Sequence, residues 1–74
     1  MRLYSDCFDR YYEKDECIPI KNTKQAGLYI KYNVFPVDIF WEDSPDNENG
    51  TLVFMFKKSD TKNLYQLWNA RVLK

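Results

Sequence analysis

The side chains that most often carry chemistry are scarce in this sequence. It contains no histidine, which removes the commonest general base, the commonest metal ligand and the Ser-His and Cys-His nucleophile pairs together. Its two cysteines, Cys7 and Cys17, are too few for a disulfide framework and too far apart for a paired metal-ligand turn. We therefore expect reduced, unreactive thiols, no catalytic residue, no metal site, no cofactor and no enzymatic activity.

Carboxylates form the densest polar cluster. Four acidic residues fall within seven positions: Glu42, Asp43, Asp46 and Glu48. Hard cations favour several oxygen ligands from one loop, but this spacing does not match an EF-hand loop. Two interpretations remain. The charges either keep an exposed loop soluble, or engage a basic groove of a partner by imitating a phosphate backbone.

Basic residues dominate the C-terminal third of the chain. Residues 1–50 contain ten acidic and six basic residues, a formal charge of −4, whereas residues 51–74 carry +4. The five basic residues there are Lys57, Lys58, Lys62, Arg71 and Lys74. Such residues could contact phosphates while tyrosines stack on single-stranded bases, although no glycine-rich phosphate loop or RNA-binding signature accompanies them. Nucleic-acid binding is therefore the alternative function.

Aromatic residues exceed what a small core can hold. The 74 residues include six Tyr, five Phe and two Trp, and exposed Tyr and Trp are typical of protein–protein hot spots. The candidate contact residues are Tyr4, Phe8, Tyr11, Tyr12, Tyr32 and Tyr65. An equal alternative is that the four N-terminal ones cover the open side of a sheet.

Periodicity predicts the elements that must position these residues. Residues 16–21 and the two runs flanking a turn-rich segment at 44–50 alternate as strands do, with Val37, Ile39 and Trp41 on one side. Pro19 places its strand at an edge, and the segment at 44–50 is expected to be a long hairpin loop. Residues 22–33 and 59–74 have helical periodicity, with Asn22 or Thr23 and Ser59 or Asp60 as N-caps and Asn33 as a C-terminal stop. Gly27 within the first helix suggests close packing against its backbone.

The fold class follows from this order of elements. We expect an α+β protein whose single-layer, three-stranded sheet carries both helices on one face, with residues 1–15 as an N-terminal arm or short helix and residues 16–74 as one β-α-β-β-α domain. The chain has no apolar run of the roughly 18 residues that a membrane span needs and no apolar signal-peptide core. A cytosolic location, without membrane contact, is therefore expected.

Three segments resemble a family of very short proteins from bacteria and their phages that is defined only as a domain of unknown function. They are IKNTKQAGLYI, NVFPVDIFW and LVFMFKKSDTKNLYQLW, and the resemblance spans about Ile18 to Trp68. It implies a phage or mobile-element setting and no particular activity. Phage proteins of this size often disable a host defence enzyme, including CRISPR nucleases. The expected function is thus binding to a larger bacterial protein, with a self-associating structural domain, and hence a homodimer, as a further alternative.

Overall fold

The computed structural model describes residues 1–74, apart from the side chains of Ser44 and Asn47. Its strands, 3-10 helix and α-helices follow one another as β1 (Arg2–Ser5), β2 (Arg10–Glu13), η1 (Lys14–Glu16), β3 (Cys17–Ile20), α1 (Thr23–Lys31), β4 (Asp38–Ser44), β5 (Asn47–Lys57) and α2 (Lys58–Asn69). The α+β class and the β-α-β-β-α order after residue 16 are as predicted. In the described chain, no helix is long and apolar enough to cross a membrane.

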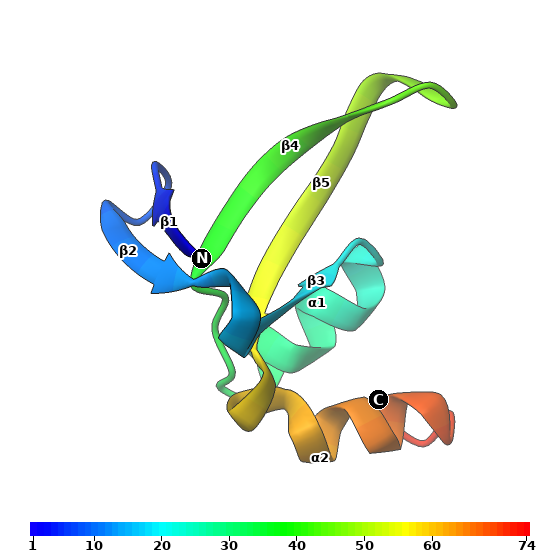
Figure 1. Ribbon diagram of the computed structural model, residues 1–74. Helices are drawn as coiled ribbons and strands as arrows, with labels where there is room; N and C mark the ends of the chain where they lie inside the picture. The colour runs from blue at the N-terminus through cyan, green and yellow to red at the C-terminus, as the bar shows by residue number, and fades with distance from the viewer.

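The main sheet has the order β3-β5-β4, and both neighbours run antiparallel to β5. The helix α1 therefore connects the two edge strands, which point in the same direction on either side of β5 (Figure 1). Pro19 lies in the edge strand β3, paired with Met55, as expected for a residue that cannot donate a ladder hydrogen bond.

Both faces of this sheet are partly covered, and each has its own core. The helix-side core contains Ile20, Ala26, Tyr29, Phe56 and Leu73, and the Tyr29 and Phe56 rings meet edge to face at 5.2 Å. The core on the opposite face, which we call the hairpin-side core, contains Tyr12, Cys17, Val37, Val53 and Met55, with Leu3 packed against it. Val37 thus departs from the predicted alternation because it precedes β4 and its N–H bonds to the Met55 carbonyl at 2.7 Å.

The helix ends agree with the sequence in part. The Asn22 side chain caps α1 by accepting from Gln25 N. Asn33 has a φ of +66°, and the hydrogen bonds Asn33 N–Ile30 O and Val34 N–Tyr29 O form a Schellman motif. The prediction of Ser59 or Asp60 as the second N-cap was wrong. The helix α2 begins directly after β5, with Lys57 at the N-cap and no side-chain hydrogen bond there.

Three further predictions differ from the structure. Of the two alternatives for residues 1–15, the short helix is wrong, because residues 2–5 and 10–13 pair as the hairpin β1–β2. The segment at 44–50 is not a long loop: Ser44 pairs with Asn47, leaving Pro45 and Asp46 as the turn. Residues 47–50, which were expected in the loop, belong to β5. The pairing of β4 with β5 has a register shift between Glu42 and Ser44. Close packing at Gly27 was also wrong, since a Cβ there would meet no heavy atom within 4 Å.

Candidate protein-docking surface

The hairpin β1–β2 has an inner and an outer face. Leu3 pairs with Tyr12, and Tyr4 pairs with Tyr11. Because neighbouring residues of a strand point to opposite faces, these two pairs lie on different sides. The first pair packs into the hairpin-side core, and the second is exposed.

A buried polar cluster attaches the inner face to the main sheet. The Asp38 carboxylate at the start of β4 accepts hydrogen bonds from Ser5 Oγ at 2.7 Å and from the Tyr12 hydroxyl at 2.8 Å. Ser5 Oγ in turn accepts from Phe8 N at 3.1 Å, which fixes the turn of the hairpin. Burial, followed by the hydrogen bond to Asp38, raises the pKa of Tyr12. Every buried polar group in this cluster therefore has a partner, which fixes the orientation of the hairpin.

The outer face carries a preformed aromatic surface, which we call the hairpin patch: Arg2, Tyr4 and Tyr11. The Tyr4 and Tyr11 rings meet edge to face at 5.1 Å, and the Arg2 guanidinium lies 4.3 Å from the Tyr11 ring centroid. The Tyr4 hydroxyl donates to Asp9, and this hydrogen bond raises the Tyr4 pKa. Asp9 itself turns the chain with a φ of +53°. The patch is exposed, although its side chains are already held by one another.

The other predicted contact residues lie elsewhere. Tyr12 points into the core, so it cannot serve as a surface contact without unfolding the hairpin. Tyr32 ends α1, where its hydroxyl donates to the Lys74 carbonyl, and Tyr65 lies on α2 beside β3. The four carboxylates belong to the β4–β5 hairpin, where Glu42 accepts from Lys21 Nζ at 2.7 Å. Of the ten predicted residues, Tyr4 and Tyr11 are brought together in the hairpin patch, and Phe8 is exposed in the turn between β1 and β2.

Sequence reasoning missed Arg2, Phe35 and Trp41. Trp41 is 67% exposed and Phe35 is 61% exposed. Trp41 shares a strand face with Ile39, as its alternation predicts, but it lies beyond the reach of β3, whose pairing with β5 ends at Ile20 and Phe54. The exposure of Trp41 therefore depends on the length of β3, which the alternation within β4 does not reveal. Arg2 could have been found from its position two residues before Tyr4, on the same face.

The polar groups that could support chemistry are dispersed. Among the side chains that the structure describes, no three His, Cys, Asp or Glu residues could jointly hold a metal ion. Cys7 is exposed and Cys17 is buried, and both are free. Burial raises the pKa of the Cys17 thiol, which disfavours the reactive thiolate.

The basic residues of the C-terminal third fall into two groups. Lys57, Lys58 and Lys62 lie near the start of α2, whereas Arg71 and Lys74 line a hollow at its other end together with Lys24. The helix from Lys62 to its last residue, Asn69, places about 10 Å between the groups at 1.5 Å per residue. The docking surface best defined by contacts is therefore the hairpin patch. No family model, curated protein or solved structure matches this chain.

Proposed function

We propose that this protein is a non-enzymatic binding module of phage or mobile-element origin, which docks onto a larger bacterial protein through the hairpin patch. In its sharpest form the proposal is an inhibitor of a bacterial defence nuclease, similar to anti-CRISPR proteins in acting by protein–protein contact in the host cytoplasm. The phage setting rests on the family resemblance. The mode of action rests on the geometry of the patch.

The supporting observation is that Arg2, Tyr4 and Tyr11 are ordered by mutual contacts while lying outside both cores. Tyr and Arg are enriched among residues whose truncation costs most binding energy. Side chains that are already fixed lose less conformational entropy on association. A standard interface takes about 800 Å² from each partner, so the patch would form the centre of a larger contact area.

Binding of nucleic acid is the alternative function. The separation of the basic residues along α2 supports it less well than the hairpin patch supports protein binding. Phosphate contacts add up when cations follow one backbone track, whereas here Lys57, Lys58 and Lys62 lie near one end of the helix and Arg71, Lys74 and Lys24 near the other. Salt distinguishes the two functions, since phosphate binding weakens steeply with ionic strength and an aromatic interface depends on it far less.

The proposal can be tested by capturing partners from a bacterial host lysate. The tagged protein is incubated with nuclease-treated lysate, washed at moderate salt, and its bound proteins are quantified by mass spectrometry. The test variant is Tyr4→Ala/Tyr11→Ala. The matched control is Tyr32→Ala, which removes an aromatic ring of similar exposure from the far end of α1.

One protein recovered in stoichiometric amount, lost with the double variant and retained with Tyr32→Ala, is the expected result. Loss with Tyr32→Ala alone would move the site to the helices. Recovery of DNA or RNA from untreated lysate, with no protein after nuclease, would contradict the proposal and support the alternative function.

A further inference from the structure

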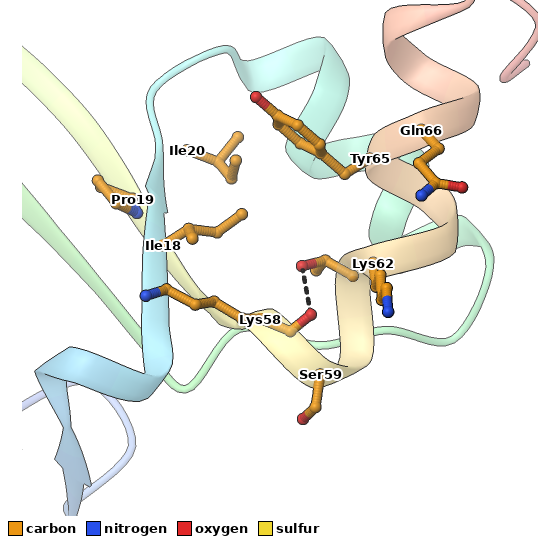
Figure 2. Close-up of a pocket in the computed structure, with 9 residues that line it drawn as sticks. Ile18, Pro19, Ile20, Lys58, Ser59, Lys62, Tyr65 and Gln66 are labelled. Atoms are coloured by element: carbon orange, nitrogen blue, oxygen red, sulfur yellow. Dashed lines mark hydrogen bonds between the residues drawn. The ribbon is translucent and has the colours of Figure 1, made fainter.

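An open groove of about 610 Å³ separates the edge strand β3 from the helix α2. Figure 2 shows the side chains of Ile18 and Ile20 pointing from β3 toward α2, with Tyr65 entering from the helix, while Pro19 points away. The floor is therefore apolar. Its volume lies within the range of pockets that enclose a drug-sized molecule, which is ample for one large side chain.

The groove is positively charged. It is lined by Lys58 and Lys62, and none of the described residues that line it is acidic. Lys58 Nζ donates to the Asp15 carbonyl at 3.0 Å, which uses one of its three N–H donors. Asp60, the acidic residue in the first turn of α2, lines a different hollow together with Arg10 and Lys57. An occupant of the groove should therefore combine an apolar side chain with carboxylates.

Residues 41–52 of β4 and β5, which we call the arm, have this combination. Figure 1 shows the arm projecting beyond both helices, with its tip at the end of the molecule away from α2. Within it, Trp41 is 67% exposed, and the exposed acidic residues Asp43 and Glu48 lie near the tip. The sequence of the arm contains no basic residue. Since the tip is remote from the groove of its own chain, only another copy can bring the two together.

We propose that the groove between β3 and α2 receives the arm of a second copy of this chain. Trp41 packs on Ile18 and Tyr65, and Asp43 and Glu48 of the arm pair with Lys58 and Lys62. The inference does not rest on the proposed function, because the hairpin patch is formed by other elements. It differs from pairing of two β3 edges, which Pro19 opposes because it offers no N–H to an added strand.

Self-association is measured by sedimentation velocity over a concentration series at low and high salt. The groove variant is Lys58→Glu/Lys62→Glu, and the arm variant is Asp43→Lys/Glu48→Lys. The charge-matched control is Lys24→Glu/Lys31→Glu, which changes two exposed lysines of α1. All substitutions lie at exposed positions, and circular dichroism verifies that each variant is folded.

The wild-type protein is expected to form dimers or longer assemblies that weaken with salt, because exposed charges are screened within about 10 Å at 0.1 M ionic strength. Each charge-reversed variant should associate roughly tenfold more weakly than the control, since reversing two exposed pairs removes attraction and adds repulsion. An equimolar mixture of the groove and arm variants should associate again, because a basic arm then meets an acidic groove.

A wild-type protein that stays monomeric at low salt up to about 1 mM would overturn the inference, as would a mixture of variants that does not re-associate. Binding of a single-stranded oligonucleotide that depends on Lys58 and Lys62, without any self-association, would assign the groove to nucleic acid instead.

Discussion

The two β-hairpins of this protein contrast in how they are held. The N-terminal hairpin β1–β2 has strands of only four residues, yet its inner face is fixed to β4 through Asp38. The β4–β5 hairpin is much longer, but before Phe54 its strand β5 pairs with β4 alone. A two-stranded hairpin without further packing is marginally stable in water, and this description fits the outer part of the β4–β5 hairpin. The short hairpin is packed against the main sheet and therefore presents the more rigid surface.

The largest expected effect comes from removing the attachment of the short hairpin. Asp38→Ala leaves the buried hydroxyls of Ser5 and Tyr12 without their acceptor, and should lower the free energy of unfolding by about 3 kcal/mol. Urea denaturation measures this loss. Asp43→Ala on the arm is the control and should change stability by less than about 0.5 kcal/mol. Equal effects of the two substitutions would mean that Asp38 does not hold the hairpin.

Alkaline pH should weaken the same attachment. Since the pKa of Tyr12 is raised in the folded state, its contribution to stability is complete below the unfolded value of about 10. Above that pH the unfolded chain releases the proton first, and stability falls by about 1.4 kcal/mol per pH unit. Urea midpoints measured between pH 9 and 11 should fall more steeply for wild type than for Tyr12→Phe. Parallel curves would contradict this assignment.

A smaller effect is expected at the arm. Gly50 has a φ of +75°, and a Cβ there would lie 3.0 Å from the Glu42 carbonyl oxygen. Gly50→Ala should therefore cost about 1 to 2 kcal/mol. Gly27→Ala is the matched substitution at an open helical position and should stabilise by up to about 1 kcal/mol. Thermal unfolding should therefore show a lower melting temperature for Gly50→Ala and an unchanged or higher one for Gly27→Ala. A higher melting temperature for Gly50→Ala would contradict the expected strain at this position.

The smallest effect concerns the ion pair between Lys21 and Glu42, which links the end of β3 to the arm at 2.7 Å. Both partners are about half exposed, so Glu42→Gln should cost at most about 0.5 kcal/mol, and high salt should abolish the difference. Chemical denaturation in urea at low and high salt checks this value. A loss above 1 kcal/mol would indicate that the arm depends on this pair.

Local patterns predicted the sheet, the two helices and the edge position of Pro19, because each of these depends on periodicity or on one residue's backbone chemistry. The N-terminal hairpin was missed because its strands are four residues long, and the spacing of Leu3, Phe8 and Tyr12 also suits a helix turn. What decides between them is the contact of Ser5 and Tyr12 with Asp38, which lies 26 or more residues away.

The candidate site was predictable by residue type and less so by position. Tyr4 and Tyr11 share the exposed side of the hairpin, but Tyr12 is one residue further and therefore faces inward. A helix would have placed Phe8, Tyr11 and Tyr12 on one face. Alternation placed Trp41 on the same side as Ile39, but its exposure follows from the short pairing of β3 with β5, which the alternation does not reveal.

The central claim is that the hairpin patch is the surface that meets a protein partner. Hydrogen exchange of the tagged protein, recovered after incubation in nuclease-treated host lysate or in buffer, tests this claim most directly. Slower exchange of the amides of residues 2–13 in lysate, with α2 unchanged, is the result that we predict. Unchanged exchange in residues 2–13, or protection confined to α2, would contradict it.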